Sequence, residues 1–546
     1  MTAATSTASG DTEGNTSAGL QAAATALSQA DAVVHSGFAH LGAAGADALD
    51  THQAVAYDLA HAAAGLASAR VMLDYGLGGA VEARLANAFA ADTLWDVSTR
   101  LLGRESAWGA APTALDATRS FVSAHRDPRW LAALASQSGP RHLDGDFEMV
   151  ADTFRRFANE RIAPVAEHIH RSNSDIPEDI ISGLGELGAF GLSIPEAYGG
   201  YATGAESDYL GMVIATEELS RASLGAGGSL ITRPEILARA LVRGGTEDQK
   251  QRWLPRLATG EIMVAVAVTE PDFGSDVANL TTAALLCHDG TGDWVISGTK
   301  TWSTFAARAD VLMLLARTDP DRSAAHRGLS LFVLDKERAD GHGFVLSQPG
   351  GGRLEGRPID TIGYRGMHSY ELAFDGWRVP GDRLIGGEGG LGRGFYYQME
   401  GFENGRLQTA ARAVGVMQAA YEAARAYAAD RRVFGRPVGD YQLSQVKLAR
   451  MAVLIQAGRQ TMYHVARLMA RGEGALEASM VKAFVCRAAE WVTREALQLH
   501  GGMGYAEEYP VSRFFVDARV LSIFEGADET LALKVIARRL LASALP

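Results

Sequence analysis

The hydrophobic pattern of this 546-residue chain changes its period twice, and this change constrains the fold more than any other feature. Apolar residues recur at helical spacing from about residue 20 to residue 262, and again from residue 394 onward. Between residues 263 and 380 they alternate in short runs, as in strands with one buried face. We therefore predict an α+β protein, mostly α, in which an antiparallel β unit follows two helical regions and precedes a third.

Turn-rich segments divide the chain further. The first residues are Ala, Thr, Ser and Gly without Lys or Arg, unlike a signal or transit peptide. The predicted parts are a disordered tail over residues 1–19, an extra N-terminal helical domain over 20–135, a linker over 136–146, a second helical domain over 147–262, a β domain over 263–380 and a C-terminal helical bundle over 394–546.

Composition excludes several classes of protein. Apolar types make up 47% and charged types 21% of the chain, so most of it is expected to pack into folded structure. The formal net charge of −13 argues against nucleic acid as a partner. With only Cys287 and Cys486, we expect no disulfide framework, and we predict no metal site. No apolar run reaches the ~18 residues of a membrane span, so we expect a soluble, cytoplasmic protein without membrane contact.

Two strand ends carry groups suited to a bound ligand. Residues 268–276 place a strand end before a Pro, Asp and Gly turn, where free N–H groups and hydroxyls can face a ligand. Alone, this segment would more often be an ordinary turn. Residues 298–304 end a second strand with Trp302 and Thr304 two positions apart, so both side chains are expected on one face. An aromatic flank beside a hydroxyl suits a flavin ring.

Two further motifs lie in the C-terminal region. Residues 498–504 contain glycines that close a helix and leave backbone amides open to an anion, although a helix C-cap is the simpler interpretation. In residues 521–528, Glu525 follows an apolar run and precedes Gly526 and a helix start. In isolation, such a carboxylate would more often cap that helix.

Together the four motifs, in this order and spacing, resemble the acyl-CoA dehydrogenase family of flavoproteins over residues 147 to 541. Further marks of the family are residues 194–200, 217–221, 249–255 and 430–435. The resemblance implies a helical domain, a β-barrel-like domain and a C-terminal four-helix bundle. It also implies FAD as cofactor, an acyl-CoA thioester as substrate and an electron-transferring flavoprotein as the electron acceptor.

The resemblance also implies roles for individual residues. Glu525 matches the catalytic base, and the alternative base position of some branches falls at Gly405. Cofactor contacts are implied for Val268, Thr269, Ser275, Trp302, Thr304, Arg431, Phe434, Gln498 and Gly502, and substrate contacts for Ser275, Arg406 and Gly526. Among these, Arg431, Phe434, Gln498 and Gly502 match residues that reach the FAD of a neighbouring subunit, so at least a dimer is expected. A buried structural ion pair is the alternative for Arg406. The family usually has Thr where this chain has Ala527, which puts one cofactor contact in doubt.

The extra N-terminal domain, with residues 50–57 and 228–236, resembles the branch that oxidises methylsuccinyl-CoA to mesaconyl-CoA. A generic short-chain or branched-chain dehydrogenase and an oxidase of the same fold are alternatives. A DNA-binding alkylation-response flavoprotein is a third alternative, but its added domain lies at the C-terminus, whereas here Glu525 is close to the C-terminus. The acidic net charge also argues against it.

A separate hypothesis concerns Arg233, which precedes Pro234. Proline holds the preceding backbone extended and limits where the side chain can point. The planar guanidinium suits a carboxylate, so we predict that Arg233 binds the free carboxylate of a dicarboxylic acyl-CoA. The arginine with this role in the glutaryl-CoA branch aligns with Gly227 here, so the role does not transfer directly, and a salt bridge is the alternative.

The N-terminal domain also contains a candidate repeat. Residues 81–89 align without gaps on residues 476–484, and residues 59–70 resemble residues 448–459. Coincidence between Ala-rich helices is the alternative. A real repeat would make the domain a degenerate copy of the C-terminal bundle, able to cover the surface through which tetrameric relatives join two dimers. We therefore predict a homodimer.

Overall fold

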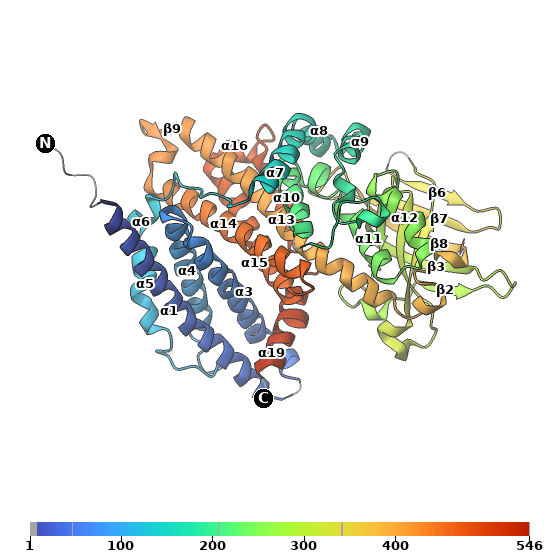
Figure 1. The fold of residues 1–546 in the computed structure, drawn as a ribbon, viewed down its shortest axis with the longest axis horizontal. Coiled ribbons are helices and arrows are strands. Elements are labelled where there is room, and N and C mark those ends of the chain that lie inside the picture. The colour runs from blue at the N-terminus through green and yellow to red at the C-terminus, as the bar shows by residue number, and fades with distance from the viewer. Residues whose placement is uncertain (1–7, 46, 206, 340–341, 545–546) are drawn as a thin grey trace. The chain divides into compact units, whose positions relative to one another are not determined.

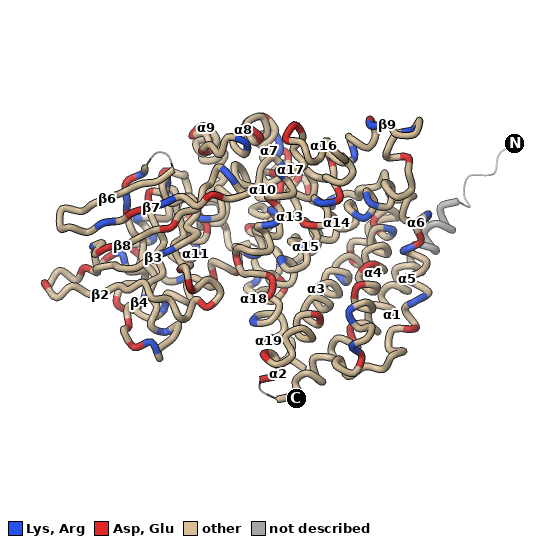
Figure 2. Tube along the Cα trace, turned by 180° about the vertical axis from the view of Figure 1, so that it is seen from behind, with Lys and Arg blue, Asp and Glu red and all other residues tan. Residues whose placement is uncertain are grey.

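The computed structural model describes residues 8–45, 47–205, 207–339 and 342–544 (Figure 1). The chain divides into two compact units, of which unit 1 comprises Met1–Glu148 with Thr409–Pro546, and unit 2 comprises Met149–Gln408. Within the described ranges, no helix is both long enough and apolar enough to span a membrane. Acidic and basic residues are interspersed along the helices of unit 1 (Figure 2).

Three long helices form the N-terminal part of unit 1: α1 (Ala8–Ala43), α3 (Gln53–Gly76) and α4 (Ala80–Leu101), which pack side by side (Figure 1). Shorter helices accompany them, namely α2 (Ala48–Thr51), α5 (Arg119–His125) and α6 (Pro128–Ala132). The predicted disordered tail is wrong for residues 8–19, which belong to α1. Residues 8–19 contain only two alanines beside three glycines, but they continue directly into an Ala-rich helix, and alanine has the highest helix propensity of all residues. Residues 1–7 lie outside the described residues.

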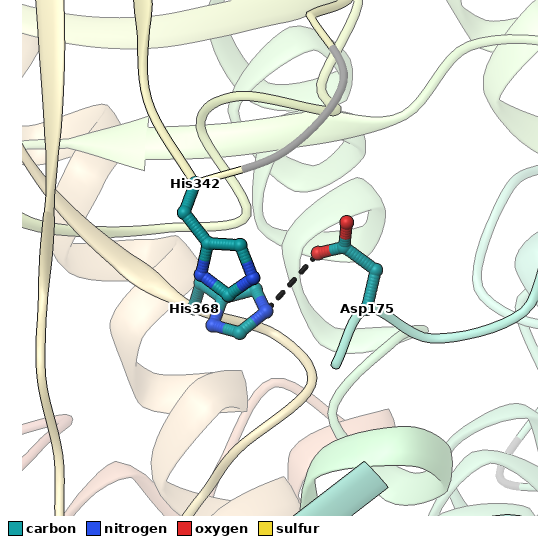
Figure 3. A group of neighbouring side chains, drawn as sticks. All are labelled: Asp175, His342 and His368. Carbon is teal, nitrogen blue, oxygen red and sulfur yellow. Dashed lines mark ion pairs between the residues drawn. The ribbon is translucent and has the colours of Figure 1, made fainter. Parts of the chain in front are cut away.

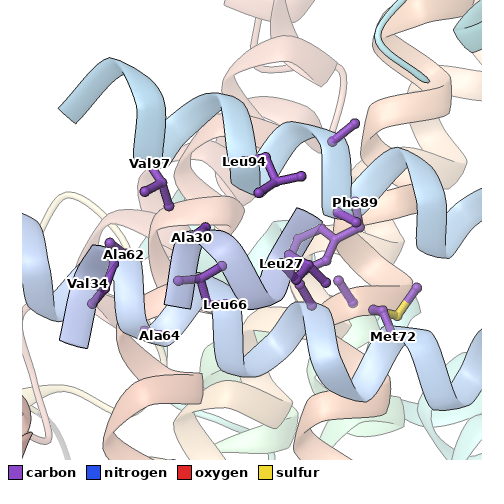
Figure 4. Packing of buried hydrophobic residues seen from close by; sticks show 14 of the residues in the cluster. Leu27, Ala30, Val34, Ala62, Ala64, Leu66, Met72, Phe89, Leu94 and Val97 are labelled. Atoms are coloured by element: carbon purple, nitrogen blue, oxygen red, sulfur yellow. The ribbon is translucent and has the colours of Figure 1, made fainter. Parts of the chain in front are cut away.

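The core of these helices mixes small and large side chains (Figure 4). Ala30, Ala62 and Ala64 are buried between the backbones, while Leu66 and Phe89 fill the remaining space. The same apolar cluster continues into the C-terminal helices through Ala449, Val453, Ala457, Met480, Ala483, Ala532, Ile536 and Ala537. The N-terminal helices therefore share one core with the C-terminal bundle instead of forming a core of their own.

The C-terminal bundle is built from long helices, as the periodicity predicts. They are α13 (Gly394–Asp430), α14 (Gln442–Ala470), α15 (Ala475–His500) and α17 (Val511–Leu521), followed by α18 (Asp528–Thr530), the π-helical segment η11 (Leu531–Ala537) and α19 (Arg538–Ala544). A hairpin of β9 (Arg432–Val433) and β10 (Arg436–Pro437) follows α13, and α16 (Gly502–Tyr505) follows α15. Helix α17 was not predicted, because only its last residue, Leu521, belongs to the apolar run that precedes Glu525.

Unit 2 begins with helices that lead into the sheet. They are α7 (Gly145–Phe157, which starts in unit 1), α8 (Ala163–Ser172), α9 (Glu178–Glu186), α10 (Ser207–Ala222), the π-helical turn η5 (Leu224–Gly228), α11 (Thr232–Gly244) and α12 (Glu247–Ala258). Thr246 caps α12 in a capping box with Gln249, which satisfies two backbone donors at the helix start.

The sheet of unit 2 has eight strands in the order β1-β4-β2-β3-β8-β7-β6, with β5 paired to β4. The strands are β1 (Val264–Ala267), β2 (Ala283–Leu286), β3 (Trp294–Thr304), β4 (Val311–Arg317), β5 (Leu329–Asp335), β6 (Phe344–Ser347), β7 (Arg353–Ile359) and β8 (Ser369–Val379). Every residue of β4 is buried, which places this strand in the middle of the core.

The prediction of a purely antiparallel sheet is wrong at β4. Strand β1 runs parallel to β4, with Val264 opposite Val311, and β2 touches β4 in parallel at its first residue. Parallel neighbours need a long connection, and the chain between β1 and β4 supplies one because it forms β2 and β3 on the way. The remaining strand pairs of this sheet are antiparallel, as predicted.

Candidate active site

Thr269, Trp302 and Thr304, which are predicted to flank the flavin ring, lie where β1 ends and β3 runs past it. We call these three residues the predicted cofactor wall. The N–H of Thr301 donates to the carbonyl oxygen of Thr269 at 2.8 Å, which joins the two segments. Thr304 is buried, and its hydroxyl lies 3.1 Å from that of Ser369 on β8. Trp302, by contrast, is 56% exposed and has a backbone φ of +58°.

Trp302 and Thr304 therefore differ in exposure, and the expectation that their side chains share a face stays a prediction. The register between β3 and β8 shifts between Lys300 and Ser303, so the alternation of side chains is broken at this bulge. A β-bulge turns one side chain away from the regular pattern, and here it presents the indole to the outside of unit 2. A flat, accessible aromatic surface still suits a flavin ring.

A buried ion pair that sequence analysis missed fixes this wall. Lys300 is fully buried, and its ammonium lies 2.9 Å from Glu270 and 3.0 Å from the carbonyl oxygen of Val268, to which it donates. Glu270 also accepts hydrogen bonds from Thr281 and Thr282. The pair directly adjoins the predicted wall, because Glu270 follows Thr269 and Lys300 lies two residues before Trp302. Only a lysine inside a predicted strand and a glutamate shortly after another could have indicated it.

Both pKa values of this pair are shifted. Burial alone would raise the pKa of the Glu270 carboxyl, but Lys300 and the hydrogen bonds from Thr281 and Thr282 outweigh it and hold the pKa at about 2. Burial lowers the pKa of Lys300 to about 8, against the opposing effect of Glu270. At neutral pH the pair is thus ionised, and each charge depends on the other.

The remaining predicted contacts of this motif differ in exposure. Val268 is buried, whereas Ser275 lies in the exposed turn that follows. The turn begins with a bridge in which Glu270 and Phe273 exchange two backbone hydrogen bonds of 3.1 Å. A turn held by backbone hydrogen bonds, with an accessible hydroxyl, fits the predicted contact of Ser275 with cofactor and substrate.

The second candidate feature is the turn that carries Glu525 in unit 1. The backbone φ of Glu525 is +54° and that of Gly526 is +101°. A left-handed backbone at a non-glycine residue typically costs ~1–3 kcal/mol and persists only where its surroundings hold it. Here the N–H of Asp528 closes the turn on the carbonyl oxygen of Ser522, and the buried Lys482 of α15 donates to the carbonyl oxygen of Gly526 at 2.7 Å.

The Glu525 carboxylate lies in a dry environment. Its side chain is only 9% exposed, and its Oε2 atom makes no hydrogen bond within the described residues. The other oxygen, Oε1, lies 4.0 Å from the guanidinium of Arg412 on α13, which is itself buried and packs over the Phe524 ring. A buried carboxylate with one oxygen unused is placed to accept a proton. Sequence analysis missed Arg412, although an arginine amid alanines on a buried helix was a visible signal.

The four residues predicted to reach a neighbouring subunit are all exposed. They are Arg431, Phe434, Gln498 and Gly502. Tyr427 of α13 stacks on His500 of α15 at a centroid distance of 4.3 Å, which brings the ends of these two helices together. Phe434 lies between the two strands of the β9–β10 hairpin and is 98% exposed. A single exposed apolar side chain is common on protein surfaces, so the contact of Phe434 with a neighbouring subunit stays a prediction.

Arg233 is placed differently from the expectation. It lies in the first turn of α11 instead of an extended segment, because proline is tolerated in the first turn of a helix. Its side chain is buried, donates to the carbonyl oxygen of Ser229 and lies 5.8 Å from the ring of Tyr364. Arg406 is half-buried on α13, one residue after Gly405.

One group of described residues could offer three ligands to a metal ion: Asp175, His342 and His368, whose ligand atoms lie within 4.8 Å of one another (Figure 3). Asp175 and the buried His368 form an ion pair at 3.0 Å, and the His342 ring lies 4.3 Å from that of His368. The backbone carbonyl of His368 accepts from Phe305, one residue beyond Thr304. The ion pair therefore supports the start of β8 beside the predicted cofactor wall.

The predicted site residues thus fall into two groups. Val268, Thr269, Ser275, Trp302, Thr304, Arg233 and Arg406 belong to unit 2, and Glu525, Gly526, Arg431, Phe434, Gln498 and Gly502 belong to unit 1.

Comparison with known proteins decides the family. Three family models match consecutive parts of the chain: acyl-CoA dehydrogenase, N-terminal domain, over residues 145–261, middle domain over 265–377 and C-terminal domain over 392–541. The chain belongs to the acyl-CoA dehydrogenase family. The enzyme accordingly has the acyl-CoA dehydrogenase fold, as the sequence motifs predict, and its first 144 residues precede the three matches.

Individual relatives agree with this assignment. The chain is 45% identical over 437 residues to (2S)-methylsuccinyl-CoA dehydrogenase of Cereibacter sphaeroides, covering 78% of this chain and 77% of that one. A glutaryl-CoA dehydrogenase from Mycobacterium smegmatis, solved in complex with FADH2, matches with a TM-score of 0.64 and 29% identity over 73% of this chain and 95% of that one. A chain solved in work on the electron transferring flavoprotein of Acidaminococcus fermentans matches with a TM-score of 0.65 and 32% identity over 73% and 98%.

The buried pair in unit 2 predicts a large effect on stability. Replacing Lys300 with Met leaves Glu270 charged and buried without its partner, and such a change typically costs ~3–5 kcal/mol. We expect Lys300→Met to lower the free energy of unfolding by this amount in urea titrations. Arg357→Met removes an exposed cation that pairs with Glu355 on the same sheet and should cost less than ~1 kcal/mol. Equal effects of the two substitutions would contradict the assigned role of the pair.

Proposed function

We propose that the enzyme oxidises (2S)-methylsuccinyl-CoA to mesaconyl-CoA, with FAD as its cofactor. The proposal is supported by the 45% identity to an enzyme of that name and by the extra N-terminal domain. The observation that carries the chemistry is the Glu525 carboxylate, buried on a strained turn with its Oε2 atom unused. That is the arrangement a base needs to remove a proton from carbon.

In this mechanism Glu525 takes the proton from C2 of the thioester at Oε2. Removing a proton from carbon is slow in water, because the C–H group is a weak acid and water solvates a carboxylate base well. Burial of Glu525 excludes competing water and aims the carboxylate, and Arg412 on its other side keeps the side chain oriented. The turn itself fixes the direction of the Glu525 side chain through its left-handed backbone.

The residues of unit 2 fit a flavin. The exposed indole of Trp302 offers a flat surface, and Thr269 at the end of β1 lies on the segment hydrogen-bonded to Thr301. When bound, FAD supplies the acceptor for the hydride that leaves C3. Thr304 and Ser275 would orient the ring and the cofactor arm, as the family resemblance implies. This chain has Ala527 where the family usually has Thr, so it lacks one hydroxyl contact to the cofactor. The other predicted cofactor contacts do not depend on that hydroxyl.

Replacing the base tests the central role of Glu525. Glu525→Gln keeps the shape of the side chain and removes its basicity, so the rate of flavin reduction by substrate should fall by ~10²–10⁴-fold. Anaerobic stopped-flow absorbance measures that rate, and FAD content should stay at the wild-type level. Glu529→Gln changes an exposed glutamate four residues later and should leave the rate unchanged. Normal flavin reduction by Glu525→Gln would exclude Glu525 as the base.

We further propose that Arg233 binds the distal carboxylate of the substrate. Its guanidinium is buried, yet its one described hydrogen bond uses only Nη1, and Tyr364 packs beside it. The neighbouring Arg365 is less suited, because it already donates to the carbonyl oxygens of Thr361 and His170. A buried guanidinium beside an aromatic ring is a suitable receptor for a carboxylate.

Substrate selectivity tests this role. A carboxylate left without its partner costs ~2–5 kcal/mol, so Arg233→Met should lower kcat/KM for methylsuccinyl-CoA by at least ~30-fold and spare butyryl-CoA. Arg243→Met changes an exposed arginine at the other end of α11 and should affect neither substrate. Equal losses on both substrates would reduce Arg233 to a structural residue and move the search to Arg406.

We propose that the enzyme is a homodimer in which each subunit completes the FAD site of the other. The exposed Arg431, Phe434, Gln498 and Gly502 would supply those contacts. The N-terminal domain would occupy the surface through which tetrameric relatives join. Its packing supports this assignment, because Phe89 and Phe484, equivalent positions of the candidate repeat, meet at a centroid distance of 5.2 Å. Two copies related by a two-fold axis bring equivalent residues together in this way.

Light scattering tests the assembly. A homodimer should have twice the chain mass of 57.9 kDa, independent of concentration over the micromolar range. A tetramer would contradict the role assigned to the N-terminal domain.

We also propose an electron-transferring flavoprotein as the electron acceptor. The family resemblance implies one, and the structural match to a chain from work on such a flavoprotein supports it. Reduced enzyme should then transfer its electrons to that flavoprotein faster than to oxygen.

A further inference from the structure

The N-terminal domain reaches the turn that carries Glu525. Two residues one turn apart on α3, Tyr57 and His61, both contact the carboxylate of Asp528, three residues after Glu525. The Tyr57 hydroxyl donates to Oδ2 of Asp528 at 2.5 Å, and Nε2 of His61 lies 3.2 Å from the same oxygen. The two rings pack edge to face at a centroid distance of 4.4 Å, so they also contact each other.

These contacts are largely shielded from solvent. His61 is buried, and the Asp528 side chain is only 12% exposed. Burial alone would raise the pKa of the Asp528 carboxyl, but its contacts with His61 and Tyr57 outweigh burial and lower it. Burial is also the largest influence on His61, and it lowers the pKa of the ring against the opposing effect of Asp528. Arg487 of α15 completes the cluster by donating to the Tyr57 hydroxyl at 3.1 Å.

Asp528 is part of the closure of the turn. Its backbone N–H donates to the carbonyl oxygen of Ser522, so residues 522 and 528 form the two ends of the loop that carries Glu525. Lys482 holds the middle of this loop from the C-terminal bundle. The N-terminal domain holds its end. A left-handed backbone at Glu525 needs such support, because a free loop would relax to a commoner conformation.

We propose that the N-terminal domain positions the catalytic base, with Tyr57 and His61 as positioning residues that act through Asp528. The proposal rests on the role of Glu525 proposed above. It gives the extra domain a part in the reaction: the domain fixes one end of the base loop from within the same chain. Displacing a catalytic group by about 1 Å can cost ~10²-fold in rate, so loss of this support should slow proton removal.

Tyr57→Phe tests the proposal because it removes one hydroxyl and keeps the ring. His61→Gln is the second variant. Asp92→Asn is the matched control: Asp92 on α4 joins the N-terminal domain to Arg450 of α14 at 2.8 Å, on a different helix pair. All three are compared with the wild-type holoenzyme.

Two measurements give the result. Hydrogen exchange followed by mass spectrometry should show amides of residues 522–528 exchanging at least ~10-fold faster in Tyr57→Phe and His61→Gln, and unchanged in Asp92→Asn. Anaerobic flavin reduction by methylsuccinyl-CoA should slow by ~10-fold or more in the two variants. The isotope effect of deuterium at C2 should rise, while FAD content and KM stay near wild type.

The outcomes separate this proposal from the preceding one. Wild-type exchange and wild-type reduction rates in both Tyr57→Phe and His61→Gln would overturn the positioning role. Equal losses in Asp92→Asn would also overturn it, because the effect would then belong to the interface in general. A normal rate in Glu525→Gln would instead overturn the base assignment, whereas the exchange result reports on the loop alone.

Discussion

A glutamate backbone held in the left-handed region is the constraint on which the proposed chemistry depends. Glu525 carries its carboxylate on a turn that L-residues rarely adopt, and three separate supports hold that turn. Asp528 closes it on Ser522, Lys482 fixes Gly526, and Tyr57 with His61 fixes Asp528. These supports involve α3, α15 and α18, so the geometry of the proposed base depends on several helices of unit 1.

The shared core explains how an added domain can take part in this arrangement. The N-terminal helices contribute alanines and a few large side chains to the same apolar cluster as α14, α15 and η11. In such a core the position of one helix constrains that of its neighbours, because closely packed side chains leave little room for independent movement. In unit 2 the Glu270–Lys300 pair has the corresponding role, since it joins the two segments that carry the predicted cofactor wall.

Much of the fold could be predicted from the sequence, because hydrophobic period and turn residues are local signals. The long helices and the β region followed from them, and the four motifs together, in their order and spacing, indicated the family. The parallel pairing of β1 with β4 and the bulge at Trp302 could not be predicted, since both depend on how distant strands meet. Glu270, Lys300, Arg412 and the contact of Tyr57 with Asp528 were missed for the same reason: their partners are distant in sequence.

The central proposal is that this enzyme oxidises a dicarboxylic acyl-CoA, methylsuccinyl-CoA. The most direct measurement is the absorbance of the bound flavin during anaerobic addition of methylsuccinyl-CoA, butyryl-CoA, isobutyryl-CoA and glutaryl-CoA in separate experiments. We expect methylsuccinyl-CoA to bleach the flavin fastest. Rapid bleaching by butyryl-CoA with none by methylsuccinyl-CoA would contradict it.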